Sequence, residues 1–294
     1  MITAKELGTI VVIATAFAVC WITSTSAQDT EMKLQMIDGP QGRLAAYHRP
    51  GNQEGVAVVF LHGDSSRALQ WAPVWRELNT PYGLIALDFR GHGESEPARD
   101  GDYSYAGRGE DVIAVVDALG AKEFLLVAHS GAAGAAFEIG VRKPAKVAGI
   151  FLLDPPNDPR SLADDVRQGF VEALAGPNSL DVQHQYFSSI AGKDPIVAAR
   201  VLEDAVIVDP AARLGIGKAI ADWNPEIAIE GYNGPLVMMI SGVMDQSSSL
   251  SRLWPGISTE IVANTGHWIQ LERPDVVVGA LLEFIQGVEQ ARGQ

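Results

Sequence analysis

Cysteine is almost absent from this chain. Only Cys20 occurs among the 294 residues, and it lies inside the apolar N-terminal stretch Ile10–Ile22. Because we expect that stretch to be removed, the mature chain has no thiol. Disulfides, thiolate metal sites and a cysteine nucleophile are therefore excluded. Lipidation of Cys20 is not expected either, since "FAVC" lacks a small residue directly before the cysteine.

Basic residues and long apolar runs are also scarce. The 22 Lys and Arg against 36 Asp and Glu leave a net charge of −14, which argues against nucleic acid and anionic lipid as partners. Ile10–Ile22 is short for a membrane span. Between Lys5 and the small residues of "TSTSAQD", it predicts a signal peptide over residues 1–27, cleaved after Ala27. The protein is then secreted or periplasmic, with no stable membrane insertion after cleavage; an uncleaved anchor is the alternative.

Apolar residues make up 47% of the chain, enough for a sizeable core. Continuous Val/Ile/Leu runs, typical of buried parallel strands, alternate with helical patterns. The strand-like runs are Val56–Leu61, Gly83–Leu87, Phe124–Ala128, Val147–Leu153, Leu236–Ser241 and Glu260–Ala263. Lys33–Ile37 and Arg43–His48 indicate an antiparallel start. The helical patterns are Ala68–Leu78, Asp111–Leu119, Ala132–Val141 and Pro274–Val288. The pattern predicts an α/β fold with helices on both faces of a mostly parallel sheet.

Residues 155–235 break this alternation. The stretch opens with "PPNDP", closes with "GYNGP", and holds the amphipathic pieces Leu162–Leu174 and Pro195–Val208. We therefore expect a helical cap over residues 155–235, inserted into a core formed by residues 28–154 and 236–294.

Ser130, in "VAHSGAAG", follows a predicted strand and precedes a predicted helix. A serine on such a sharp turn presents its hydroxyl above the sheet, provided that the residues two positions away are small. Ala128 and Ala132 meet that requirement. Ser130 is therefore a candidate nucleophile, and the backbone N–H of Gly131 is a candidate oxyanion donor. The alternative is a plain helix N-cap.

The motif "FLHGDSS" places Asp64 after a His62–Gly63 turn, where its backbone N–H can be the second oxyanion donor. A carboxylate aimed at an oxyanion would oppose it. We expect the Asp64 side chain to point away, or to bond Ser66 or a loop N–H. The alternative is that it recognises a cationic group of a substrate.

His267, in "GHW", follows the last predicted strand and is the candidate base among six histidines. The acid candidate is Asp245 in "MISGVMDQ", because the order Ser, Asp, His with the acid shortly before the base matches this architecture. Asp154, in "LLDPP", is the rival. Trp223 and Trp268 are candidate pocket residues. No nucleotide-binding loop and no metal-ligand spacing are present in the sequence.

Taken together, "LHG", "DFRGHGES", "AHSGA", "SGVMD" and "GHWIQLERP" resemble the α/β-hydrolases of the serine esterase and lipase type, in the family's order. The resemblance implies an eight-stranded sheet, a helical cap after the sixth strand and a Ser130–Asp245–His267 triad. It also implies an oxyanion hole formed by the Asp64 and Gly131 amides. The chain departs from the common pattern in the alanines around Ser130 and in Asp64. A serine nucleophile disfavours the haloalkane dehalogenase and epoxide hydrolase branches.

The expected activity is hydrolysis of a small-molecule carboxylic ester through an acyl-enzyme, without a cofactor. The same triad can act on a lactone, an amide or a carbon–carbon bond, or in perhydrolysis, because fold and triad do not select the bond. A ligand-binding protein with an inherited hydrolase pocket is the rival from another class.

Overall fold

A single eight-stranded sheet forms the centre of the computed structural model, which describes residues 31–53 and 55–292. The strand order is β1-β2-β4-β3-β5-β6-β7-β8. Strand β2 pairs antiparallel with both neighbours, β1 and β4, and all other neighbouring strands pair in parallel. The strands are β1 Lys33–Asp38, β2 Arg43–Arg49, β3 Val56–Leu61, β4 Gly83–Leu87, β5 Glu123–His129, β6 Val147–Leu153, β7 Leu236–Ser241 and β8 Ser258–Val262. The predicted mostly parallel sheet with an antiparallel start is confirmed.

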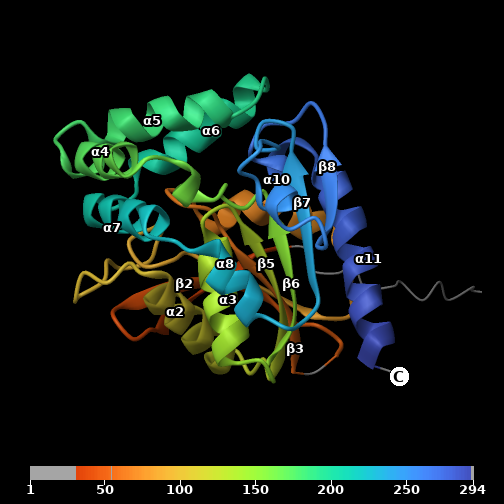
Figure 1. The fold of residues 1–294 in the computed structure, drawn as a ribbon. Helices are drawn as coiled ribbons and strands as arrows, with labels where there is room; N and C mark the ends of the chain where they lie inside the picture. Colours follow the sequence, from red (N-terminus) through yellow and green to blue (C-terminus); the bar gives the residue numbers. More distant parts are fainter. Residues whose placement is uncertain (1–30, 54, 293–294) are drawn as a thin grey trace, which may run out of the picture.

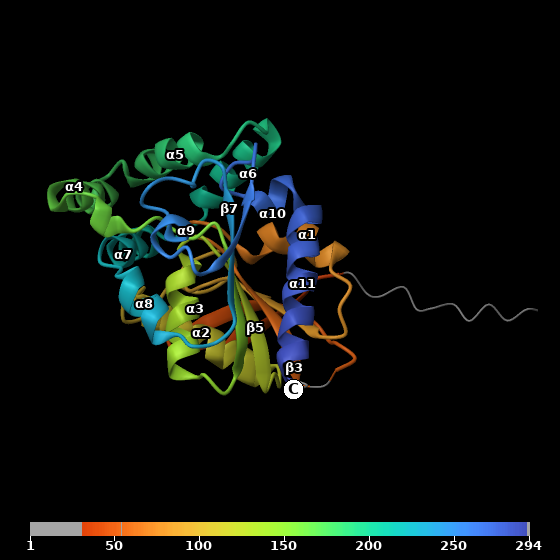
Figure 2. The ribbon, with the colours of Figure 1, turned by 45° about the vertical axis from the view of Figure 1, so that its right-hand side comes forward.

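Helices cover both faces of the sheet, as Figure 2 shows with the sheet seen edge-on. One face carries α2 Tyr105–Ala118 and α3 Ala132–Arg142; the other carries α1 Ala72–Glu77 and α11 Pro274–Arg292. Two separate clusters of buried apolar side chains, one on each face, form the core. The remaining short helical turns are η1 Ala68–Trp71, η2 Pro159–Ser161, α9 Leu250–Leu253 and α10 Ile269–Glu272.

A cap of helices lies between β6 and β7 in the chain and above one end of the sheet (Figure 1). It consists of α4 Asp164–Ala175, α5 Ser179–Ile190, α6 Pro195–Val206 and α7 Pro210–Ala221. The next helix, α8 Pro225–Gly231, packs against α3 of the core instead. The helical cap therefore ends before α8 and not at residue 235.

Sequence signals mark the first residues of three of these helices. Asp194, Asp209 and Asn224 each stand directly before a proline, and each side chain accepts a backbone N–H of the first turn. An acidic or amide N-cap followed by proline at the first helical position is a strong start signal. The Asp209 and Asn224 signals mark α7 and α8, which apolar periodicity alone does not predict.

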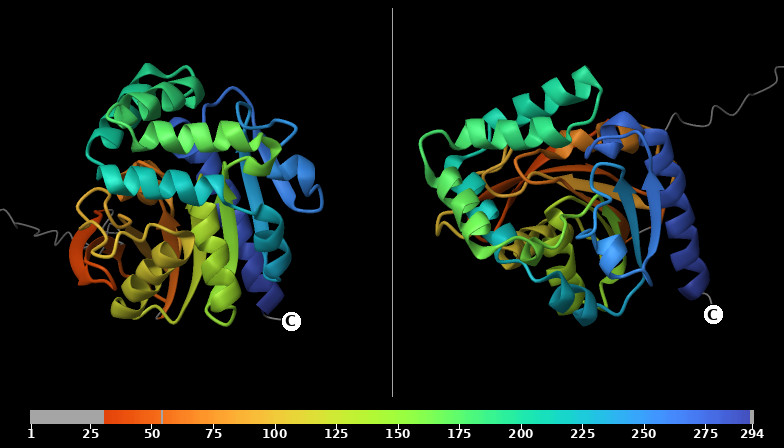
Figure 3. Two further views of the ribbon diagram at one scale, coloured as in Figure 1. Left: turned by 60° about the vertical axis from the view of Figure 1, so that its left-hand side comes forward. Right: turned by 45° about the horizontal axis from the view of Figure 1, so that its top comes forward.

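The cap is fastened to the loops that follow β3 and β8. The Ile190 carbonyl accepts the backbone N–H of His267 at 2.8 Å. Gln70, in η1, donates to Asp204 of α6 at 2.7 Å, and Arg200 of α6 donates to the Leu69 carbonyl at 2.6 Å. Because these loops leave the carboxyl ends of parallel strands, the cap covers that end of the sheet (Figure 3).

The predicted signal peptide, residues 1–27, lies outside the described residues, as does Cys20. Within residues 31–53 and 55–292, no helix is both long and apolar enough to span a membrane.

Candidate active site

Ser130 lies on a strained turn between β5 and α3. Its φ is +53°, a left-handed conformation that non-glycine residues rarely adopt. Ala128 and Ala132 on either side are fully buried, which explains why these positions need small side chains. A Cβ on Gly63 would lie 3.0 Å from the Ser130 Cβ and 2.7 Å from Nδ1 of His129. The loop after β3 therefore packs closely against the Ser130 turn at Gly63, where a larger residue would collide.

A continuous hydrogen-bonded chain joins Ser130, His267 and Asp154. The Ser130 hydroxyl donates to Nε2 of His267 at 2.8 Å, and Nδ1–H of His267 donates to Oδ2 of Asp154 at 2.8 Å. His267 is 3% exposed and Asp154 is fully buried. The geometry is that of a nucleophile, a general base and the carboxylate that orients the base.

Asp154 directly follows β6 and, like Ser130, has a positive φ, of +49°. Ser241, the last residue of β7, holds its carboxylate: the backbone N–H donates to Oδ1 at 2.8 Å and the hydroxyl donates to Oδ2 at 2.6 Å. Three donors therefore compensate the buried charge, since His267 supplies the third.

Asp245 is not the acid partner of His267, so that prediction is wrong. Its carboxylate accepts from Nε of Arg252 at 2.8 Å, in a pair whose arginine is 57% exposed. Asp245 lies beyond the end of β7, on a turn that faces Arg252, whereas Asp154 ends the strand adjacent to β5. Both candidates satisfy the order Ser, Asp, His, and the shorter separation of Asp245 from His267 in the chain does not bring the two side chains together.

Both backbone amides predicted as oxyanion donors are left without an acceptor. The N–H groups of Asp64 and Gly131 make no hydrogen bond with any acceptor among the described residues. Gly131 is buried and starts α3, where the helix dipole favours negative charge. Buried amides without partners are costly in a folded protein and are typical of a site that bonds a ligand atom.

The sequence led us to expect that the Asp64 side chain points away or bonds Ser66 or a loop N–H. In the structure it bonds Arg108 instead of Ser66 or a loop N–H. Its Oδ1 accepts from Nη1 of Arg108 at 2.9 Å, and the carboxylate lies against Gly131. Burial raises the pKa of Asp64, and the Arg108 guanidinium opposes that rise. Arg108 lies on α2, far from the recognised motifs, and no sequence signal pointed to it.

His129 supports the histidine loop. Its Nε2–H donates to the backbone carbonyl of His267 at 2.9 Å, and the two rings lie 4.7 Å apart between centroids. Burial lowers the pKa of His129 well below the usual value, so it acts as a neutral donor. The Trp268 ring packs beside the rings of His267 and of Phe187 in the cap, with a distance of 5.0 Å between centroids in each pair.

The remaining motif residues have structural roles. Nε2 of His62 accepts the N–H of Phe89 at 3.0 Å, and Nδ1–H of His92 donates to the Arg90 carbonyl at 3.0 Å. Arg90 also forms a buried ion pair with Asp111 at 2.6 Å. The "DFRGHGES" loop is thereby fixed beside the site.

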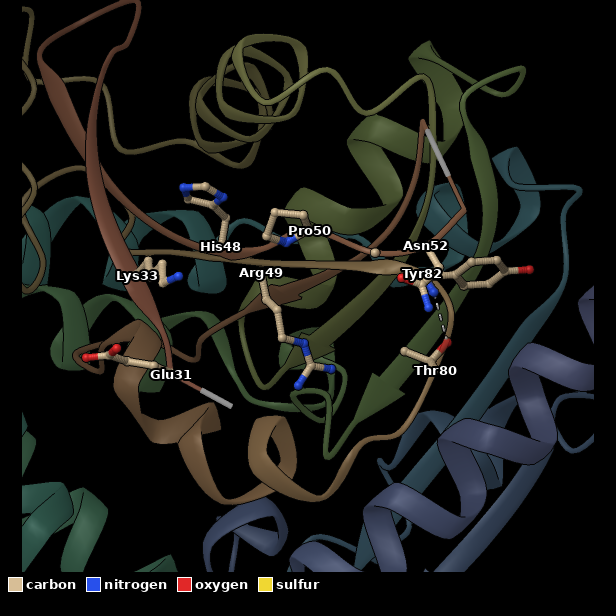
Figure 4. Close-up of a pocket in the computed structure, with 9 residues that line it drawn as sticks. Glu31, Lys33, His48, Arg49, Pro50, Asn52, Thr80 and Tyr82 are labelled. Carbon is tan, nitrogen blue, oxygen red and sulfur yellow. Dashed lines mark hydrogen bonds between the residues drawn. The ribbon is translucent and has the colours of Figure 1, made fainter. Parts of the chain in front are cut away.

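Trp223, the other predicted pocket residue, is 6% exposed and packs on Tyr105 at 6.1 Å; its contact with a substrate stays a prediction. A separate cavity, lined by His48, Arg49, Thr80 and Tyr82, lies at the amino end of β4 (Figure 4). That is the opposite end of the parallel strands from Ser130, so this cavity is not part of the active site.

The sequence matches the Alpha/beta hydrolase family over residues 58–280. It is 28% identical over 257 residues to the dihydrolipoyllysine-residue acetyltransferase component of the acetoin cleaving system of Pseudomonas putida, covering 83% of this chain and 67% of that protein. A thermophilic esterase from Thermogutta terrifontis superposes with a TM-score of 0.73 at 18% identity, covering 87% and 99% of the two chains. Est816, described as an N-acyl homoserine lactone degrading enzyme, superposes with a TM-score of 0.71 at 19% identity, covering 85% of this chain and 100% of that one.

The chain belongs to the alpha/beta hydrolase family, because the family match spans most of its length. It is accordingly assigned as an enzyme of the hydrolase type. The structural neighbours below 25% identity support the fold alone.

Proposed function

We propose that the chain is a serine hydrolase that cleaves a carboxylic ester through an acyl-enzyme on Ser130. One observation carries the proposal: Ser130, His267 and Asp154 form a hydrogen-bonded chain with two 2.8 Å contacts at the carboxyl ends of β5, β6 and β8. A helix N-cap serine needs no buried base behind it, and a binding protein needs no carboxylate behind that base.

The first half-reaction transfers the acyl group to the enzyme. His267 Nε2 takes the hydroxyl proton while Ser130 Oγ attacks the ester carbonyl, and the carbonyl oxygen becomes an oxyanion bonded by the amides of Asp64 and Gly131. Asp154 stabilises the imidazolium. Collapse of this tetrahedral intermediate breaks the bond to the alcohol oxygen, which takes the proton from His267. The acyl group stays on Ser130 as an ester.

The second half-reaction releases the acid. His267 takes a proton from water, the hydroxide adds to the acyl carbonyl, and Ser130 leaves with the proton returned by His267. The cap lies over this end of the sheet and contacts the His267 loop through Ile190. We expect the cap to limit water access and to select the acyl or alcohol part.

A substrate panel with the Ser130→Ala variant tests the proposal. We expect p-nitrophenyl esters to be hydrolysed and kcat/KM to fall by a factor of about 10³ or more in the variant. Unchanged turnover by Ser130→Ala would defeat the assignment. Lactones and aryl amides of matched acyl groups in the same panel decide which bond is preferred.

A lactone is the second candidate substrate. Est816, whose fold this chain shares, is described as a lactone-degrading enzyme. A cyclic ester passes through the same steps, except that the released alcohol stays attached to the acyl group. A higher kcat/KM for lactones than for open esters of equal acyl length would favour this reaction.

We also propose that residues 1–27 direct export and are removed. Intact-mass measurement of the secreted protein should give a chain beginning at Gln28. A mass that includes residues 1–27 would instead support an uncleaved anchor.

A further inference from the structure

The Asp64 carboxylate has one oxygen without a partner. Oδ1 is bonded by Arg108, but Oδ2 is buried and accepts no hydrogen bond within the part of the chain that the structure describes. The whole side chain is 10% exposed. A buried carboxylate oxygen without a donor is costly, which indicates that the donor comes from a bound molecule.

This oxygen lies against Gly131, the residue whose amide is a candidate oxyanion donor. A Cβ built on Gly131 would come within 1.8 Å of Asp64 Oδ2, so the carboxylate rests on the backbone of the residue next to Ser130. A carbonyl oxygen bonded to the Gly131 amide would therefore come close to Oδ2, and a donor on the neighbouring acyl carbon could reach it.

The charge balance selects the kind of donor. Arg108 is 1% exposed and forms an ion pair with Asp64. Its guanidinium carbon lies 5.5 Å from the centroid of the Phe89 ring and 4.8 Å from that of the Tyr105 ring. The Asp64–Arg108 pair has no net charge, so a substrate cation would gain little from Asp64 while it lost its water. A neutral N–H or O–H loses less water and still forms a strong bond to a carboxylate.

We propose that Asp64 Oδ2 accepts a hydrogen bond from a neutral donor on the carbon next to the reacting carbonyl. The substrate class is then an ester or lactone that carries an N-acylamino or hydroxyl group at that carbon. This inference rests on the proposed function and narrows its substrate. Asp64 is in this role a specificity residue, whereas Ser130 and His267 carry out the chemistry.

A matched pair of esters tests the inference. p-Nitrophenyl N-acetylglycinate and p-nitrophenyl 4-oxopentanoate differ by an N–H in place of a CH2. After correction for their hydroxide-catalysed hydrolysis rates, we expect kcat/KM to favour the N–H ester by about 10- to 100-fold, the range for a hydrogen bond to a charged group. In Asp64→Asn, the amide oxygen keeps the bond to Arg108 and an NH2 replaces Oδ2, so the preference should fall to about one.

Asp245→Asn is the control, because it also removes an aspartate charge but lies away from Ser130; it should keep the wild-type ratio. A wild-type ratio near one, or a preference that survives in Asp64→Asn, would overturn the inference and leave the proposed function intact. Failure of Ser130→Ala to abolish hydrolysis of either ester would overturn both.

A third ester tests the inference with the wild-type enzyme alone, so this test does not require the Asp64→Asn variant to fold. p-Nitrophenyl N-acetylsarcosinate replaces the N–H by N–CH3. The wild-type enzyme should lose the preference with this ester, and retention of the preference would show that the N–H is not bonded.

Discussion

Replacement of Asp154 by asparagine should inactivate the enzyme without unfolding it. Asp154 has a φ of +49°, and asparagine is the residue other than glycine that tolerates this conformation best. The Ser241 amide donates to Oδ1 at 2.8 Å, so the asparagine of the variant is expected to place its side-chain oxygen there. Its NH2 group then takes the place of Oδ2, facing Nδ1 of His267 and the Ser241 hydroxyl.

That arrangement reverses the hydrogen bond to His267. Nδ1 lies 2.8 Å from the Oδ2 position and would have to accept from the NH2 group, so the ring proton moves to Nε2. Nε2 then carries a proton where it should accept one from Ser130. We expect kcat to fall by a factor of about 10⁴, or about 5 kcal/mol in the activation barrier.

The assay compares kcat and kcat/KM of Asp154→Asn and Asp245→Asn on a p-nitrophenyl ester, with thermal unfolding of both variants. Asp245→Asn breaks an ion pair with the exposed Arg252, which contributes little to stability, and should stay within about twofold of wild-type activity. The reasoning is refuted if Asp245→Asn loses activity while Asp154→Asn, correctly folded, keeps it.

Three further substitutions follow from the contacts. Gly131→Ala would bring a Cβ within 1.8 Å of Asp64 Oδ2, so kcat/KM should fall at least about 100-fold in a folded protein, and wild-type kinetics would contradict the oxyanion assignment. Gly266→Ala would place a Cβ 2.4 Å from the Ala191 carbonyl carbon in the cap; thermal unfolding should show a loss of about 2 kcal/mol or more, and an unchanged midpoint would argue against this docking. Burial lowers the pKa of His92 from 6.5 to about 4. Between these two pH values, the unfolded chain therefore binds a proton at His92 that the native state does not bind. His92 therefore contributes stability above about pH 6.5 that is lost as the pH falls, by about 2 kcal/mol at pH 4.5; urea titrations of His92→Asn should show a flatter pH dependence, and a curve parallel to wild type would contradict the shift.

The sheet was predictable because its signal is local. Buried parallel strands are continuous apolar runs, so β3, β4, β6 and β7 begin and end where the sequence indicates. Helix α2 was harder: it begins at Tyr105 rather than Asp111, because Gly107 and Gly109 disguise its first turns. A Cβ on Gly107 would clash with Asp102 at 2.4 Å, so close packing explains that glycine.

The site was predictable where a motif fixes a side chain next to a strand end, as for Ser130 and His267. The acid was not, since Asp154 and Asp245 both follow strands and both precede His267 in the chain. The hydrogen bond from His267 to Asp154 decides between them, and Ser241 holds the Asp154 carboxylate in place for it. The partner of Asp64 could not be foreseen either, because Arg108 comes from a distant helix without a motif.

The most direct test is covalent labelling with a fluorophosphonate, read by mass spectrometry of the digested protein. The account predicts one adduct, on the peptide that contains Ser130, with slower formation in His267→Ala and none in Ser130→Ala. An enzyme that hydrolyses esters while its label is found on another residue, or remains in Ser130→Ala, would contradict it.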